Sequence, residues 1–123
     1  NFRKLEINQY KQNLYHSASD LTVCCSRAES LPQFIVETII CGNPVVSFNV
    51  GGIKESVKHG ENGYLFKPGD HKGLAKTIKD LYAKDDKRLK FGRNSLRIYE
   101  KNFKFEVMAE KTLKMYKKVL KTN

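Results

Sequence analysis

The sequence lacks the features that define several classes of protein. No apolar run approaches the roughly 20 residues that a membrane-spanning helix needs, and the first residues contain no apolar segment of the kind a signal peptide carries. The three cysteines, Cys24, Cys25 and Cys41, cannot all pair, and none has zinc-ligand spacing with a histidine. Internal repeats and low-complexity segments are also missing. These absences exclude transmembrane, disulfide-rich, collagen-like and zinc-ribbon proteins, and they predict a cytoplasmic protein with free thiols.

The composition is that of a globular domain with an excess of positive charge. Of the 123 residues, 40% are hydrophobic, which is enough to form a core and excludes wholesale disorder. The 23 Lys and Arg residues outnumber the 13 Asp and Glu residues, which gives a net charge of +10. Part of this excess lies near the end of the chain, at Lys111, Lys114, Lys117, Lys118 and Lys121.

Three interpretations of these terminal lysines stay open. Lysines along a helix are most often a solvated face. They also suit peripheral contact with an anionic membrane, here its inner face, and non-specific contact with nucleic acid. No aromatic-interleaved basic motif is present, so we expect no specific nucleic-acid partner.

Short apolar strands alternate with amphipathic helices along the chain. The strands are predicted at 21–25, 45–48 and 64–66, the first two buried on both faces, with Cys24 and Cys25 in the core. Strands separated by helices favour an α/β fold with a parallel sheet. We therefore predict a partial Rossmann-like, three-layer domain over residues 1–123, with helices on both faces of the sheet. Because such sheets usually have five or six strands, the domain is expected to be truncated.

The helix between the first two strands has the clearest signals. We expect Ser30 to cap it, Pro32 to lie in its first turn and Gly42 to end it in the left-handed conformation. Apolar spacing predicts the other helices from Leu5 to about Ser19, over a short segment from Ile53 to Lys58, from the capping residue Asp70 to Tyr82, around Leu89 to Tyr99, and from Phe105 to Leu120. Tyr10 and Tyr15 have the spacing of core residues in the first of these helices.

Polar residues follow the first predicted strand and precede the helix. In open parallel sheets, ligands bind at the carboxyl ends of the strands, and the start of a helix favours phosphate. Glu37 lies about two turns into the helix, where its carboxylate could accept hydrogen bonds from ribose hydroxyls. The sequence therefore predicts a nucleotide site at this edge.

The segments after the second strand allow more than one role. Gly51 and Gly52 suit either close approach of the backbone to a ligand or a tight turn with positive φ. Glu55 suits a helix start and a ligand contact equally well. Asn62 and Gly63 are predicted to form a turn with positive φ.

Glu29 and Glu37 are separated by seven residues, and this spacing resembles the E-x7-E motif of retaining nucleotide-sugar glycosyltransferases with the GT-B fold. The segments 41–46, 51–52 and 60–63 match the same family in order and spacing. The chain looks like the C-terminal, donor-binding half of a family 4 (group 1) enzyme, and the resemblance covers about residues 15–105.

This resemblance implies a role for each matched residue. Glu29 would be the catalytic-site residue that contacts the transferred sugar, and Glu37 would bind the ribose. The implied donor-binding residues are Glu29, Leu31, Pro32, Gln33, Phe34, Glu37, Gly51 and Gly52. The implied reaction transfers a hexosyl group, with retention, from a nucleoside-diphosphate sugar to a glycan or lipid-linked acceptor. It needs no metal and no cofactor, because helix dipoles and basic side chains stabilise the leaving diphosphate.

The sequence also departs from the family. Ser30-Leu31-Pro32 stands where the family often has Gly-Phe-Gly, and nothing in residues 1–20 matches its diphosphate-binding Arg and Lys. The N-terminal acceptor-binding domain is absent, so we expect this chain alone to be inactive. Two alternatives belong to other classes: a non-catalytic flavodoxin- or receiver-like module, and a basic adaptor for membranes or nucleic acid. A receiver needs paired acids at the strand ends, where this chain has Ser26 and Asn49.

Overall fold

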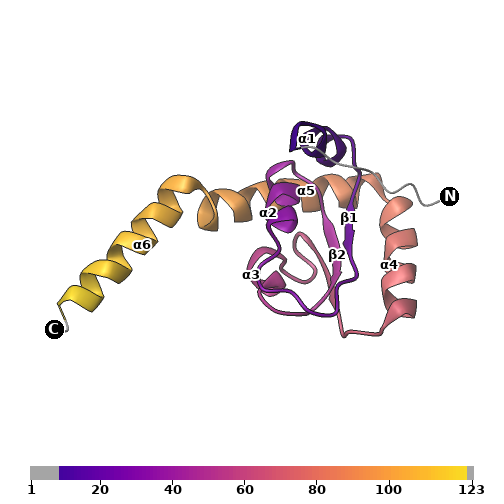
Figure 1. The fold of residues 1–123 in the computed structure, drawn as a ribbon. Coiled ribbons are helices and arrows are strands. Elements are labelled where there is room, and N and C mark those ends of the chain that lie inside the picture. The colour runs from indigo at the N-terminus through magenta and orange to yellow at the C-terminus, as the bar shows by residue number, and fades with distance from the viewer. Residues whose placement is uncertain (1–8, 122–123) are drawn as a thin grey trace.

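The computed structural model describes residues 9–121, which form helices and a parallel sheet (Figure 1). The elements in chain order are α1 (Gln9–Ser17), β1 (Thr22–Cys24), α2 (Gln33–Ile40), β2 (Val45–Phe48), α3 (Ile53–Ser56), β3 (Gly63–Phe66), α4 (His71–Tyr82), α5 (Asp85–Asn102) and α6 (Phe105–Leu120). Each predicted helix and strand is present. The predicted start of the first helix, at Leu5, and the side chain of Tyr10 lie outside what the structure describes.

The described strands form one sheet in the order β1-β2-β3, all parallel. All four residues of β2 are buried, as predicted for a central strand. β1 is shorter than predicted and pairs on one side only, with Val23 38% exposed and Cys25 exposed; only Cys24 enters the core. The prediction that the first strand is buried on both faces, with Cys25 inside, is therefore wrong: Val23 lies on a face that is open to solvent, and Cys25 lies beyond the end of the strand.

The side chains of β2 alternate between two hydrophobic clusters, one on each face of the sheet. Val45 packs with residues of α2 and α3, while Val46 and Phe48 pack with residues of α4. The longest helix, α5, contributes Ile98 to the first cluster and Phe91 to the second. Figure 1 shows α2 and α3 on one side of the strands and α4 on the other. The predicted three-layer α/β architecture is confirmed.

Two of the predicted helix boundaries are confirmed and one is wrong. Gly42, with φ of 75°, follows the end of α2, and the Asp70 carboxylate accepts a hydrogen bond of 2.9 Å from the Gly73 N–H at the start of α4. However, α2 begins after Pro32, which occupies the N-cap position, and no side chain caps it. Ser30 lies two residues too early to cap the helix, and its carbonyl accepts a hydrogen bond from Gly52 instead.

The turn before β3 also differs from the prediction. Gly60, with φ of 79°, takes the left-handed conformation, and Gly63 is the first residue of β3. Asn62 is fully buried and its side chain is a structural cross-link: Oδ1 accepts from the Lys58 N–H at 2.7 Å, and Nδ2 donates to the Ser56 carbonyl at 3.1 Å. Neither Asn62 nor Gly63 has a positive φ, so the prediction of a positive-φ turn at these two residues is wrong; the left-handed residue of this turn is Gly60.

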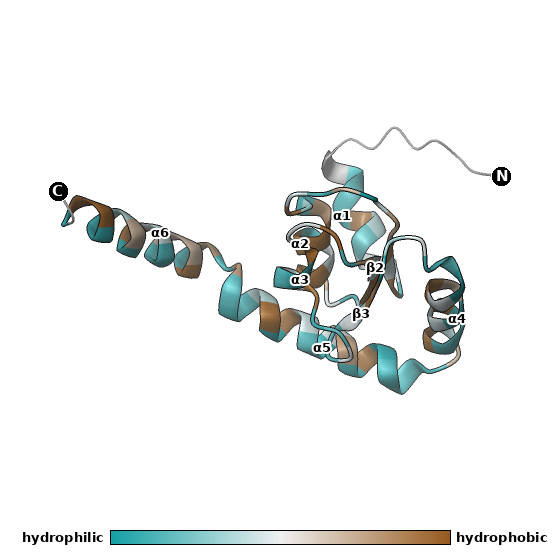
Figure 2. Cartoon of the chain, turned by 90° about the horizontal axis from the view of Figure 1, so that it is seen from below, coloured by the Kyte–Doolittle hydropathy of each residue, from teal (hydrophilic) through white to brown (hydrophobic). Residues whose placement is uncertain are grey.

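Helix α6 projects away from the sheet (Figures 1 and 2). Its apolar residues, as predicted, recur on one face, but none is buried in the described chain. The exposed ones are Phe105, Met108, Leu113, Met115, Tyr116, Val119 and Leu120.

Tyr15 of α1, predicted to be a core residue, is 42% exposed, so that prediction is wrong. No helix within residues 9–121 is both long and apolar enough to cross a membrane.

Candidate functional site

The loops that follow β1 and β2 pack against each other at the carboxyl edge of the sheet. The Gly52 N–H donates a hydrogen bond to the Ser30 carbonyl. Gly51 has φ of +51°, and a Cβ built on it would overlap the Glu29 carbonyl. A Cβ on Gly52 would lie 2.6 Å from the Ser30 carbonyl oxygen, closer than real Cβ atoms come. The positive φ of Gly51 confirms the tight-turn interpretation. The close approach seen here is to the backbone of the other loop, so a contact of these glycines with a ligand stays a prediction.

This contact brings several of the predicted site residues together. Glu29, half-buried, and Leu31, exposed, belong to the first loop; Gly51 and Gly52 belong to the second. The Glu55 carboxylate lies beside them, since its Oε1 would be 3.5 Å from a Cβ on Gly52. Because glycine backbone holds the loops in place, the acidic side chains remain available to contact a ligand.

The start of α2 carries the other predicted donor-binding residues. Pro32 is buried at the N-cap, Gln33 is exposed, and the Phe34 side chain packs against the core cluster of α2 and α3. The Phe34 side chain is partly buried by this packing, so the backbone of Phe34 and the exposed part of its ring are what a ligand could contact. The first N–H groups of a helix have no partner within the helix, and the positive end of its dipole lies there. This arrangement is chemically suited to a phosphate.

Glu37 contacts a helix that the sequence interpretation did not connect with it. Its Oε2 accepts a hydrogen bond of 2.6 Å from Gln12 Nε2, and His16 Nε2 lies 3.6 Å from the same oxygen. Both residues belong to α1. Gln12 and His16 are four residues apart and so share one face of that helix; this spacing is the signal that could have singled them out.

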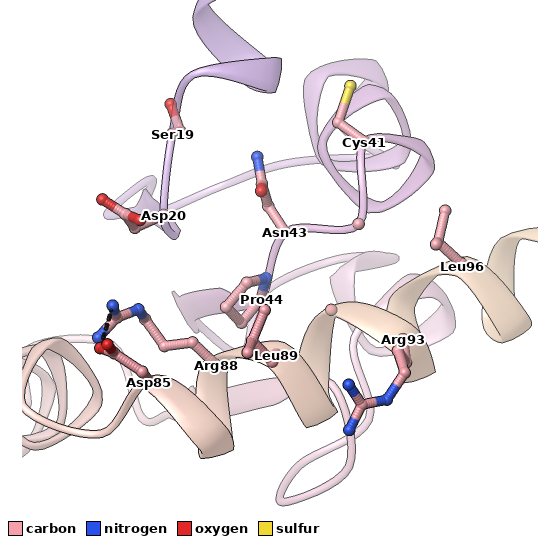
Figure 3. A pocket seen from close by; sticks show the side chains of 12 residues that line it. Ser19, Asp20, Cys41, Asn43, Pro44, Asp85, Arg88, Leu89, Arg93 and Leu96 are labelled. Carbon is pink, nitrogen blue, oxygen red and sulfur yellow. Dashed lines mark hydrogen bonds and ion pairs between the residues drawn. The ribbon is translucent and has the colours of Figure 1, made fainter.

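A cavity of about 450 Å³ lies at the opposite, amino end of the sheet (Figure 3). Its charged lining residues are Asp20, Asp85, Arg88 and Arg93, which balance one another. Arg88 is already engaged, because it donates to Asp85 Oδ1 at 2.6 Å and to the Leu81 carbonyl at 2.7 Å. None of the predicted site residues lines this cavity. We therefore place the candidate site at the carboxyl edge.

Among residues 9–121, no group of three or more His, Cys, Asp or Glu side chains is arranged to hold a metal ion. Metal independence stays a prediction from the resemblance.

Comparisons with known proteins agree with the residue pattern. The spore coat protein SA of Bacillus subtilis is 34% identical over 105 residues, which are 84% of this chain and 28% of that protein. Sucrose-phosphate synthase from Thermosynechococcus elongatus superposes on 95% of this chain and 29% of its own, with a TM-score of 0.84 and 26% identity. The structure of Anabaena HepE with UDP superposes on 85% of this chain and uses 29% of the HepE chain, with a TM-score of 0.78 and 30% identity. HepE has also been solved with UDP-glucose.

The chain thus spans less than a third of the length of these relatives. The family model described as glycosyl transferases group 1 matches residues 4–97, a range that includes both motif glutamates and both glycines of the loop contact. The predicted relationship to GT-B glycosyltransferases is confirmed by this match and by the shared fold. The chain belongs to the group 1 family of glycosyl transferases.

Proposed function

We propose that this chain is the donor-binding part of a glycosyltransferase that transfers a hexosyl group, with retention, from a nucleoside-diphosphate sugar to a glycan or lipid-linked acceptor. The observation that carries the proposal is the carboxyl edge of the sheet, where the Glu29 loop is held by Gly51 and Gly52 beside the start of α2. The structures of HepE with UDP and UDP-glucose support a nucleotide-sugar donor.

Each part of the donor has a chemically matched group in this proposal. Ribose hydroxyls donate hydrogen bonds to Glu37, and hydroxyls of the transferred sugar donate to Glu29. The diphosphate lies at the start of α2, near Leu31 to Phe34. When the bond from the sugar to the diphosphate breaks, negative charge grows on the leaving group, and the helix dipole stabilises it. The acceptor would bind to sequence beyond this chain, since the relatives are much longer.

A ligand-observed NMR titration with UDP, GDP, ADP and their glucose conjugates tests the donor site. We expect one nucleotide to bind, and Glu37→Ala to weaken it about tenfold or more, because a hydrogen bond to a charged group is lost. Glu61→Ala is the matched control: it removes the same charge from an exposed loop before β3. Equal affinities of wild type and Glu37→Ala would rule out the ribose role. Failure of every nucleotide to bind would contradict a donor site on this chain.

A specific observation also favours the peripheral membrane contact. The exposed apolar face of α6 includes Phe105, Leu113 and Leu120. The lysines of this helix, Lys111, Lys114, Lys117 and Lys118, fall outside that face at helical spacing. A helix with an apolar face and a basic polar face suits the surface of an anionic bilayer. We propose that α6 makes such a contact, which would bring the donor site near a lipid-linked acceptor.

Sedimentation with phosphatidylglycerol vesicles, compared with phosphatidylcholine vesicles, tests the membrane contact. We expect binding to the anionic vesicles only, and its loss in Leu113→Glu. Leu89→Glu introduces the same charge on an exposed position of α5 and should keep binding. Absence of binding by the wild type would remove the membrane contact and leave the donor proposal intact.

A further inference from the structure

We propose that Gln12 and His16 of α1 are positioning residues that hold Glu37 ready for the ribose. This inference rests on the proposed function, since it concerns how the ribose-binding carboxylate is kept in place. Gln12 Nε2 donates to Glu37 Oε2 at 2.6 Å, and His16 Nε2 lies 3.6 Å from that oxygen. The side chain of Glu37, the second glutamate of the E-x7-E motif, thus connects α1 with α2.

The contacts with α1 leave Glu37 one oxygen for a ligand. Both are made to Oε2, and the Glu37 side chain remains 31% exposed. Oε1 therefore stays available to accept a hydrogen bond from a ribose hydroxyl. Gln12 is a neutral donor, so it fixes the carboxylate without cancelling the negative charge that the hydroxyl would meet.

His16 is itself anchored on the side away from Glu37. Its Nδ1 lies 3.1 Å from Thr38 Oγ1, and Thr38 is fully buried and donates to Thr22 Oγ1 of β1 at 3.3 Å. The His16 side chain is 12% exposed, and its Nε2 is a buried atom with no hydrogen-bond partner among the described residues. That orphaned atom faces the Glu37 carboxylate. The His16 ring therefore packs against the side of Glu37 that faces α1. Through Thr38 and Thr22, the same ring is connected to β1.

Positioning of this kind raises affinity by lowering the entropy lost on binding. A free Glu side chain loses rotamer freedom when it is ordered by a ligand. If α1 already orders Glu37, the nucleotide does not have to do so. Gln12 acts through Glu37 in this account and does not itself contact the nucleotide. Its effect must therefore require both Glu37 and a ribose hydroxyl.

The test uses the nucleotide that the wild-type chain binds, together with its 2′,3′-dideoxy analogue. Gln12→Met keeps the length of the side chain and removes the donor, and we expect it to weaken the ribonucleotide about 3- to 10-fold. We expect no change for the dideoxy analogue, and none from Gln12→Met in a chain that already carries Glu37→Ala. His16→Phe, which keeps a ring but removes both Nε2 and the Nδ1 contact with Thr38, should shift affinity in the same direction. Asn13→Leu removes an exposed amide next to Gln12 and is the control that should bind like wild type.

The outcomes separate this inference from the proposed function. Equal weakening of the ribonucleotide and its dideoxy analogue by Gln12→Met would show a general structural defect and overturn the positioning role. An unchanged ribonucleotide affinity in Gln12→Met, with Glu37→Ala still impaired, would also overturn it while leaving the ribose role of Glu37 standing. If Glu37→Ala itself has no effect, or the wild type binds no nucleotide, the proposed function fails and the inference fails with it.

Discussion

The two ends of the sheet are fastened in different ways. At the amino end, buried side chains make the connection: Asn62 Nδ2 donates to Ser95 Oγ at 3.3 Å, and Ser95 Oγ donates to the Asn43 carbonyl at 2.8 Å. At the carboxyl end, the connection is made by backbone, with Gly51 and Gly52 against the loop of Glu29 and Ser30. The side chains of Asn62 and Ser95 are therefore engaged in the connection at the amino end, whereas the side chains of Glu29 and Glu55 at the carboxyl end take no part in it and remain partly or fully exposed.

This difference makes the carboxyl end the better candidate for the site, although a cavity of about 450 Å³ lies at the amino end. Some polar groups around that cavity are already engaged: Arg88 bonds to Asp85, and the Asn43 carbonyl accepts a hydrogen bond from Ser95. The carboxyl end has the acidic side chains and the start of a helix, which are the groups that a nucleotide needs. We therefore identify the candidate site by its acidic side chains and the start of α2, and not by the volume of a cavity.

The largest expected effect comes from breaking the backbone contact at the carboxyl end. Gly51→Ala should destabilise the fold by about 2–5 kcal/mol, because it adds left-handed strain to a steric overlap with the Glu29 carbonyl. Gly60→Ala is the matched control: φ is +79° there, but no atom lies within 4 Å of the added Cβ. It should cost only the strain, about 1–2 kcal/mol. Urea unfolding measures both, and equal losses would contradict the loop contact.

A somewhat smaller effect is expected from breaking the amino end. Asn62→Ala removes bonds to Lys58, Ser56 and Ser95 from a fully buried position, and should cost about 2–3 kcal/mol. Asn94→Ala removes two bonds at the surface, one to the Glu61 carbonyl and one from Arg97 Nη1 at 3.3 Å, and should cost less than about 0.5 kcal/mol. Nucleotide affinity measured where both variants are folded should equal that of the wild type. A weakened affinity in Asn62→Ala would show that the two ends do not act independently.

The smallest expected effect concerns the cap of α4, which lies at the carboxyl end yet has a purely structural role. Asp70→Ala should lower stability by about 1 kcal/mol, because the bond to the Gly73 N–H is lost. Asp70→Asn retains an oxygen acceptor and should stay close to wild type in thermal unfolding. If Asp70→Ala instead lowers nucleotide affinity, Asp70 belongs to the site.

Local signals explain which parts of this fold could be predicted. The apolar run of β2, Gly42 at the end of α2 and Asp70 at the start of α4 each act through neighbouring residues, and the structure confirms them. The prediction was wrong for Cys25, because the strand ends at Cys24, one residue earlier than the apolar run does. It was also wrong for Asn62, whose partners include a residue 33 positions away.

In the candidate site, too, features that depend on nearby residues could be predicted and contacts between distant residues could not. The spacing of Glu29 and Glu37 is visible in the sequence and is typical of the family, so the amino-acid pattern is enough to single these residues out. The contact of Gln12 with Glu37 joins residues 25 positions apart on different helices. The four-residue spacing of Gln12 and His16 places both on one face of α1, but it does not show that this face contacts Glu37. Likewise, two adjacent glycines indicate a positive φ or a close approach of the backbone to another group. Only the fold shows that the group is the backbone of the Glu29 loop.

The most direct test of the account is to map nucleotide binding onto the two ends by amide NMR shifts. On titration with the nucleoside diphosphate that binds, we predict that the largest changes occur at residues 29–37 and 51–52. Amides around the amino-end cavity, such as Asn43 and Leu96, should remain unchanged. Changes concentrated at Asn43 and Leu96, with residues 29–37 unaffected, would place the nucleotide at the wrong end of the sheet and contradict the account.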